Sequence, residues 1–190
     1  MTCMKRAQRI FIAVVLFSIV SACSRENDRD NSVAAEEKNE QKFDTRAEEK
    51  EANFVAGAIE EKYADIKLAE LASTKSSNKE VQEVAQQLVK DQSESLAVLQ
   101  NLANKKGIVF PAEEGEQTSE KVNELSKQED PDFDKKWCDE IIGKHKKTIR
   151  EFELMRDKST DPELKEIITH DLQGLRAHLD RLDSLEENIM

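Results

Sequence analysis

Hydrophobic residues recur along most of this chain at the three-to-four-residue spacing of amphipathic helices. The pattern predicts a first long helix that begins at Asn53 and ends in the polar segment 73–78. A second long helix is predicted from Asn78, whose side chain can cap its first turn, to Gly107, a residue suited to ending a helix. Each of these helices has one apolar stripe that must be covered by other parts of the chain.

The second half of the chain repeats this pattern. Asp130-Pro131 and Asp161-Pro162 are expected to open a third and a fourth long helix, because proline is tolerated in the first turn. Residues 118–127 can form a short helix in the central connection. Four long helices with one apolar stripe each are best satisfied by packing the stripes together. We therefore predict an all-α domain over residues 51–190, an antiparallel four-helix bundle with an added short helix in the central connection.

The first 22 residues follow a different pattern. Three basic residues precede the apolar run Ile10–Val20, and the small residues Ser21 and Ala22 come directly before Cys23. The run is shorter than the roughly 20 residues that cross a bilayer, so a cleaved export signal is favoured over a transmembrane helix. The order Val20-Ser21-Ala22-Cys23 resembles the lipobox of bacterial lipoproteins, which implies a cysteine that carries lipid chains such as palmitate. An ordinary secretory signal with an incidental cysteine is the alternative.

Residues 23–50 are almost wholly polar. Such a segment cannot bury a core, so we expect a lipid-anchored, flexible acidic tether, with a helix as the alternative in its Ala/Glu/Lys-rich later part. Ser24 follows Cys23. By analogy with the bacterial lipoproteins that this segment resembles, in which an aspartate at that position implies retention in the inner membrane, the serine implies the outer membrane. The expected location is therefore the cell envelope, with the domain held at the outer membrane and facing the periplasm.

The charge and cysteine content of the chain limit the classes of binding partner and chemistry that it can have. Without residues 1–22 the chain has 26 Lys+Arg against 40 Asp+Glu, a net charge of −14. Nucleic-acid backbones and anionic lipid heads would be repelled, so no nucleic-acid partner is expected. Cys138 is left without an intrachain partner and is interpreted as a small buried hydrophobe. No phosphate-binding loop, nucleophile elbow or Ser/His/Asp order is present, so catalysis is disfavoured.

A few polar residues fall on the apolar stripes of the helices. When each helix is projected at about 100° per residue, five polar side chains point inward: Asp65, Gln92, His145, Asp171 and His178. Buried polar groups must be paired, so two interpretations stay open. One is a hydrogen-bonded core network that includes Gln92. The other is a transition-metal site that uses His145, His178, Asp65 and Asp171, although neither histidine follows a glutamate by three residues as in di-iron bundles.

Other polar residues are interpreted as surface groups. His170 projects away from its apolar stripe, and Lys144 belongs to a basic run with Lys146 and Lys147 that is expected to be solvated.

Short segments between residues 53 and 185 resemble, in order, the domain-of-unknown-function 4142 family, which consists of exported bacterial proteins with a ferritin-like helical bundle. The segments are Asn53-Phe54-Val55, Ala64-Asp65-Ile66-Lys67-Leu68-Ala69, Val81-Gln82-Glu83-Val84-Ala85, Lys90-Asp91-Gln92, Lys105-Lys106-Gly107-Ile108, Asp132-Phe133-Asp134-Lys135-Lys136-Trp137, His145-Lys146-Lys147-Thr148-Ile149 and Leu172–Leu179. The resemblance implies a metal or polar cluster with an acidic residue at Asp65 and histidines at positions 92, 145 and 178. This chain has Gln92 at the first of those histidine positions.

Together these patterns favour a lipid-anchored envelope protein of unassigned biochemical activity. We expect a non-catalytic binding or envelope-stress component that contacts the membrane through Cys23 and has a protein partner in the envelope. The alternative is a metal-binding or metal-dependent redox protein with a site inside the bundle, in which case a transition metal ion would be the cofactor. The oligomeric state is not predicted by the sequence.

Overall fold

The computed structural model describes residues 31–189, which form six helices in chain order. They are α1 (Asn31–Lys42), α2 (Arg46–Lys75), α3 (Lys79–Lys106), α4 (Glu116–Ser126), α5 (Asp132–Lys158) and α6 (Pro162–Ile189). The predictions for the export signal, for Cys23 and for the first part of the tether lie outside the described residues. Within the described range no helix is long and apolar enough to span a membrane.

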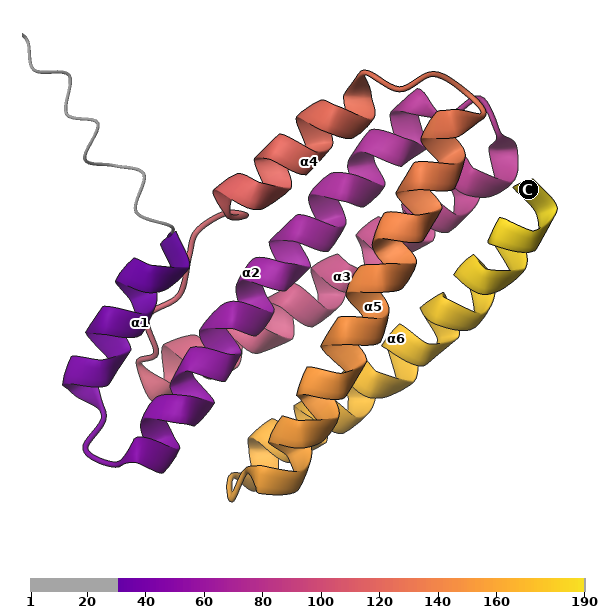
Figure 1. Ribbon diagram of the computed structural model, residues 1–190. Helices are drawn as coiled ribbons and strands as arrows, with labels where there is room; N and C mark the ends of the chain where they lie inside the picture. The colour runs from indigo at the N-terminus through magenta and orange to yellow at the C-terminus, as the bar shows by residue number, and fades with distance from the viewer. Residues whose placement is uncertain (1–30, 190) are drawn as a thin grey trace, which may run out of the picture.

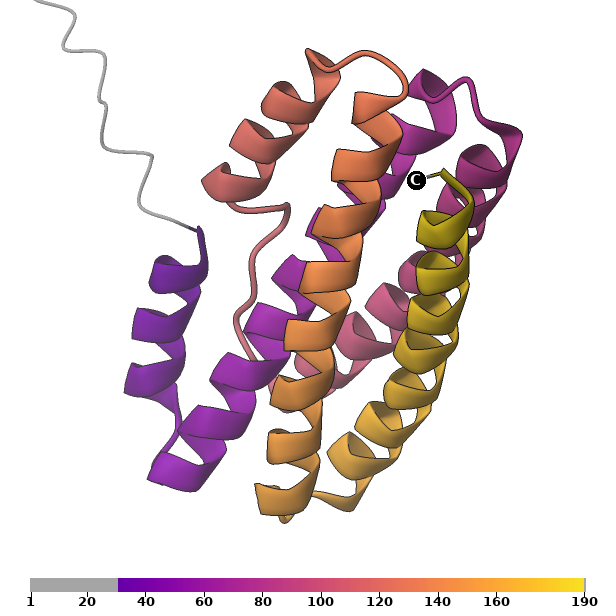
Figure 2. The ribbon, with the colours of Figure 1, turned by 45° about the vertical axis from the view of Figure 1, so that its right-hand side comes forward.

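The four long helices α2, α3, α5 and α6 pack side by side (Figures 1 and 2). Helix α2 packs against α3 and α5, while α6 packs against α5 and α3, so the four form a closed square. The short helix α4 lies in the connection between α3 and α5 and covers the seam between α2 and α5. The predicted all-α class is confirmed.

Local chemistry explains where the helices begin and end. The Asn78 side chain accepts a hydrogen bond of 2.9 Å from the backbone N–H of Glu80 at the start of α3. Gly107 ends that helix with φ 66°, a left-handed conformation that glycine adopts without strain. At the start of α6, Asp161 Oδ1 accepts bonds from the backbone N–H groups of Glu163 and Leu164. These three boundaries agree with the sequence pattern.

The start of α2 differs from the prediction. The helix begins at Arg46 and not at Asn53, which lies about two turns inside it. Thr45 and Glu48 form a capping box, in which the Thr45 hydroxyl accepts from the N–H of Glu48 and the Glu48 carboxylate accepts from the N–H of Thr45. This reciprocal cap outweighs the weaker capping potential of Asn53, because the intervening residues are good helix formers.

The later part of the predicted tether is also helical and packed. In α1, Ala35 is 2% exposed and Asn39 is fully buried. The Asn39 amide donates to the carbonyl oxygen of Val109 and accepts from its N–H, both at 2.9 Å. The helical alternative for the later part of residues 23–50 therefore agrees with the structure, and a flexible coil there does not. Asn39 holds α1 against the loop after α3, and Ala35 adds an apolar contact to the core beside α2.

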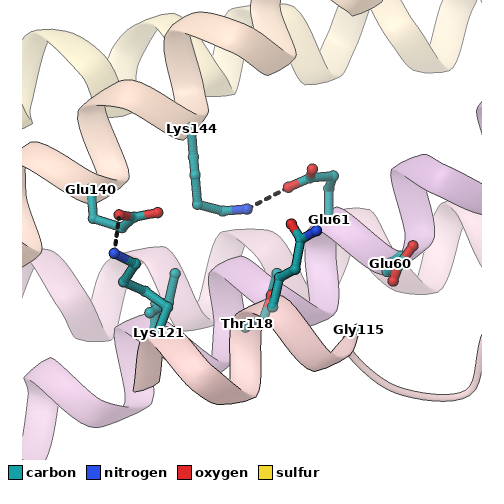
Figure 3. A pocket seen from close by; sticks show the side chains of 10 residues that line it. Glu60, Glu61, Gly115, Thr118, Lys121, Glu140 and Lys144 are labelled. Carbon is teal, nitrogen blue, oxygen red and sulfur yellow. Dashed lines mark hydrogen bonds and ion pairs between the residues drawn. The ribbon is translucent and has the colours of Figure 1, made fainter. Parts of the chain in front are cut away.

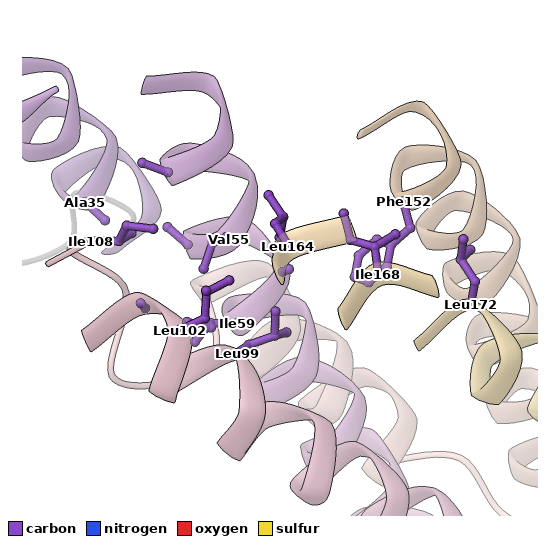
Figure 4. Close-up of a cluster of buried hydrophobic side chains, with 14 of the residues drawn as sticks. Ala35, Val55, Ile59, Leu99, Leu102, Ile108, Phe152, Leu164, Ile168 and Leu172 are labelled. Carbon is purple, nitrogen blue, oxygen red and sulfur yellow. The ribbon is translucent and has the colours of Figure 1, made fainter. Parts of the chain in front are cut away.

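Apolar side chains fill the bundle in two separate layers. One contains Val55, Ile59, Leu99, Leu102, Phe152, Leu164, Ile168 and Leu172, among others (Figure 4). The second contains Leu68, Val81, Leu88, Phe133, Trp137, Ile141, Leu182 and others at the opposite end. On α2, α3 and α5 the two layers are separated by polar positions near the middle of each helix. This polar layer is the candidate functional site.

Candidate functional site

Each of the four long helices places at least one polar side chain in the middle layer of the bundle. The buried members, with their exposed fractions, are Lys62 3%, Asp65 4%, Gln92 1%, His145 0% and Asp171 7%. The His178 side chain is 11% exposed and lies at the edge of the layer. Of the five polar residues predicted to point inward, four are buried and His178 is nearly buried. Lys62, which the sequence analysis did not single out, is buried with them.

Lys62 is the internal cation of this layer. Its Nζ donates a hydrogen bond of 2.8 Å to Gln92 Oε1 and lies 3.3 Å from Asp171 Oδ2. The Ser95 hydroxyl donates to the same Asp171 oxygen at 2.7 Å. The ammonium therefore balances the charge of Asp171 inside the protein, where an unpaired charge would cost several kcal/mol.

Asp65 connects this ion pair to the opposite side of the bundle. Gln92 Nε2 donates to Asp65 Oδ2 at 3.1 Å, and Lys144 Nζ lies 3.7 Å from Asp65 Oδ1. Lys144 also forms an ion pair with Glu61. Burial alone would lower the pKa of Lys144. The negative charges of Asp65 and Glu61 outweigh this effect and hold the pKa above its ordinary value. The interpretation of Lys144 as a solvated surface group is wrong, since its side chain is only 18% exposed.

The two histidines lie side by side with unused nitrogens. The His145 and His178 rings meet edge to face with centroids 5.6 Å apart, and His145 Nδ1 is 4.0 Å from Asp65 Oδ2. His178 Nε2 donates to Asp91 Oδ2 at 3.0 Å. Both ring nitrogens of His145 and Nδ1 of His178 are buried without a hydrogen-bond partner. Burial lowers the pKa of His145 to about 4, so this imidazole is neutral near pH 7.

The donor set for a metal ion is incomplete. Asp65, His145 and His178 come together, whereas Asp171 is bound to Lys62 and Ser95. Within residues 31–189 no group of three His, Cys, Asp or Glu side chains has an arrangement that could hold a metal ion. A metal role for these four residues stays a prediction of the sequence.

A pocket of about 480 Å³ lies between α3 and α6 and opens onto the polar layer. Lys62, Gln92, Asp171 and His178 reach it from the layer, and Val98, Ile167 and Leu175 provide apolar lining. Glu94, Glu166 and His170, all three exposed, also line the pocket. The pocket combines a few convergent polar groups with apolar walls, which is the usual composition of small-molecule sites.

A second pocket, of about 280 Å³, lies on the opposite side of the bundle beneath α4 (Figure 3). Two ion pairs cross it, Lys144 with Glu61, and Lys121 with Glu140 at 3.5 Å. Lys144 extends from this pocket to Asp65, so the polar layer reaches the surface on both sides of the bundle. Of these two pockets, the one between α3 and α6 has the more apolar lining, and it is the better candidate for a ligand.

Cys138 has the surroundings of a packing residue. It is fully buried and its Sγ donates to the carbonyl oxygen of Leu182 at 3.6 Å. Burial raises the pKa of this thiol to about 12, which leaves almost no reactive thiolate near neutral pH. The neighbouring residue, Trp137, donates its indole N–H to the carbonyl oxygen of Leu68 at 2.9 Å. The interpretation of Cys138 as a small buried hydrophobe agrees with this environment.

Comparison with known proteins identifies a family and a fold. A family model described as a domain of unknown function (DUF4142) matches residues 36–185. No curated protein matches the chain. Among solved structures, the crystal structure of a DUF305 fragment from Deinococcus radiodurans is similar, with a TM-score of 0.66 and 14% sequence identity. The similarity covers 73% of this chain and 95% of that fragment, and at this identity it concerns the fold alone.

Proposed function

This chain belongs to the domain-of-unknown-function 4142 family, and from that premise we propose that it is a lipid-anchored envelope protein that binds a small molecule without transforming it. The binding site in this proposal is the pocket between α3 and α6. The observation that carries the proposal is that the buried charges of the polar layer reach a largely apolar pocket at that point.

The bonding within the layer supports binding rather than catalysis. The Ser95 hydroxyl donates to Asp171, whose carboxylate is already paired with the Lys62 ammonium. Oδ2 of Asp171 is therefore already occupied by one hydroxyl donor and one ammonium group. His178 donates to Asp91 and not to a hydroxyl or thiol. The layer therefore holds fixed charges in place, as a recognition site requires.

The anchor is proposed from the sequence of residues 1–24. An export signal that ends at Cys23 supports lipidation, and Ser24 supports retention at the outer membrane with the domain facing the periplasm. We expect Cys23→Ser to abolish incorporation of labelled palmitate and to release the protein from the membrane fraction. Unchanged labelling in cells that express this variant would contradict the anchor.

The pocket can be filled by a substitution that the fold should tolerate. Gly174 lines the pocket, and a Cβ atom added there would meet no atom within 4 Å. Leucine is also a better helix former than glycine, so Gly174→Leu should fold. The matched control is Gly143→Leu on α5, which also has open space around the added Cβ but lines none of the pockets described above.

We expect the protein isolated from its own membranes to carry a small molecule that mass spectrometry detects after denaturation. Gly143→Leu should retain this molecule, while Gly174→Leu should lose about tenfold or more of it, the equivalent of about 1.4 kcal/mol of binding free energy. Equal small-molecule content in all three proteins would contradict the proposed binding function.

The unused histidine nitrogens favour a second candidate, transition-metal binding. His145 and His178 together have three buried nitrogens without partners, and imidazole is a ligand for zinc, copper and iron. If this candidate holds, elemental analysis of the purified protein will find stoichiometric metal that is lost in His145→Ala and retained in His170→Ala. Protein that folds fully without bound metal, when refolded in the presence of these ions, would remove this candidate.

A further inference from the structure

We propose that the ligand of the pocket between α3 and α6 is a small organic cation, in which an ammonium group is attached to an apolar body. This inference rests on the proposed binding function and names the chemical class of its ligand. Three independent properties of the pocket lead to it: the charge of its lining, the free acceptor at its base and its apolar walls.

The lining of the pocket has an excess of negative charge. It contains four carboxylates, Asp91, Glu94, Glu166 and Asp171, and one lysine, Lys62. The charge of Lys62 is already used by Asp171. In the described part of the chain, neither Glu94 nor Glu166 has an ion pair or a side-chain hydrogen bond. Two uncompensated carboxylates, one from α3 and one from α6, therefore attract a cation and repel an anion.

The base of the pocket offers a specific acceptor. Ser95 and Lys62 both contact Oδ2 of Asp171, so neither contact uses Oδ1 of this buried carboxylate. In Asp91, by contrast, Oδ1 accepts from Gln87 and Oδ2 accepts from His178. An ammonium group that enters the pocket would thus donate to Asp171 Oδ1, with the two glutamates adding longer-range attraction.

The walls of the pocket select an apolar body next to the charge. Val98 is 47% exposed, and Ile167 and Leu175 lie across the pocket on α6. The space beside Gly174 is open. A bare metal ion or a polyamine would leave this apolar surface in water. An alkyl or aromatic group would cover it, and each Å² of apolar surface buried contributes about 25 cal/mol of favourable free energy. Charge and shape together favour an alkylamine or arylalkylamine.

The test compares hexylamine with hexanol and hexanoate, which share the alkyl chain and differ in charge. The chain from residue 24 onward contains all six helices and both apolar layers, and amide NMR shifts of Val98 and Gly174 report on the pocket. We expect hexylamine to bind about tenfold or more tightly than hexanol, and hexanoate not to bind. Added salt should weaken the binding of hexylamine alone.

A charge-matched pair of variants locates the effect. Glu94→Gln with Glu166→Gln should weaken hexylamine binding about tenfold and leave hexanol binding unchanged. Glu83→Gln with Glu187→Gln makes the same charge change on α3 and α6 outside the pocket, and should have no effect. Both pairs replace exposed residues, so they are expected to fold.

The results separate this inference from the proposed function. If hexanol binds as tightly as hexylamine, or if the Glu94/Glu166 pair changes nothing, the inference is overturned while small-molecule binding stands. If none of the probes shifts the pocket resonances but Gly174→Leu still removes the native molecule, the cationic class is again wrong and binding stands. If Gly174→Leu also changes nothing, both fail.

Discussion

Replacing Lys62 with methionine is expected to lower the free energy of unfolding by about 3–5 kcal/mol, the cost of breaking a buried ion pair from one side. Methionine fits the methylene path of the lysine but leaves the Asp171 carboxylate, 7% exposed, without its counter-charge. It also leaves Gln92 Oε1 without the donor that lies 2.8 Å away. Urea unfolding followed by circular dichroism at pH 7 measures the loss.

Two further variants show whether the loss comes from the buried charge. Adding Asp171→Asn to Lys62→Met removes the uncompensated carboxylate, so the double variant should regain a large part of the stability. Lys105→Met breaks the surface pair with Glu163, whose side chains are 66% and 44% exposed, and should cost less than about 1 kcal/mol. A Lys62→Met cost no larger than that of Lys105→Met would show that the Lys62–Asp171 pair is not a structural element of the core.

Lys62 also shows why the sequence predicted only part of the site. It precedes Asp65 by three residues and follows Ala58 by four, so the projection that turns Asp65 inward also turns Lys62 inward. Lysine is almost never fully buried without a partner, and a long chain with a terminal charge normally reaches solvent. The partners here, Gln92 and Asp171, come from α3 and α6, and no local pattern in α2 reveals them.

The fold was more accessible to sequence analysis, because most of its determinants are local. The Asn78 cap, the left-handed Gly107 and the Asp161 cap each act within four residues, and each is visible as a short motif. Helix α1 is the counter-example. Its docking includes two hydrogen bonds between Asn39 and Val109, which are 70 residues apart, and packing against α2. No local motif reveals these contacts, and the polar composition of α1 resembles that of a tether.

The position of the polar layer has a consequence for the bundle as a whole. If only hydrophobic contacts held the bundle together, the helices could shift along their axes relative to one another, because the hydrophobic effect is not directional. The chain of contacts from Lys144 through Asp65, Gln92 and Lys62 to Asp171 links all four long helices at one height. A fixed register also fixes the pocket beside it, because the pocket is lined by members of the same chain of contacts.

The stability of the domain is expected to fall as the pH drops from about 6.5 towards 4, with about 2–3 kcal/mol of that loss assigned to His145. Burial lowers the pKa of His145 from 6.5 to about 4, so in this interval the unfolded chain binds a proton that the folded chain does not. The free energy of unfolding is therefore largest above pH 6.5. Of the groups that face the ring, Asp65 opposes the lowering of the pKa, while His178 and Lys62 add to it.

Urea unfolding at pH 7 and at pH 4.5, with a chelator present, measures this dependence in the wild type and in His145→Phe. Phenylalanine preserves the edge-to-face contact with His178 but cannot take up a proton, so the variant should lose about 2–3 kcal/mol less than the wild type over the same interval. His170→Gln, which removes an exposed imidazole, should follow the wild type. If His145→Phe and the wild type lose the same stability, the His145 imidazole takes up its proton in the folded bundle at the same pH as in the unfolded chain. That result would contradict the lowered pKa of His145.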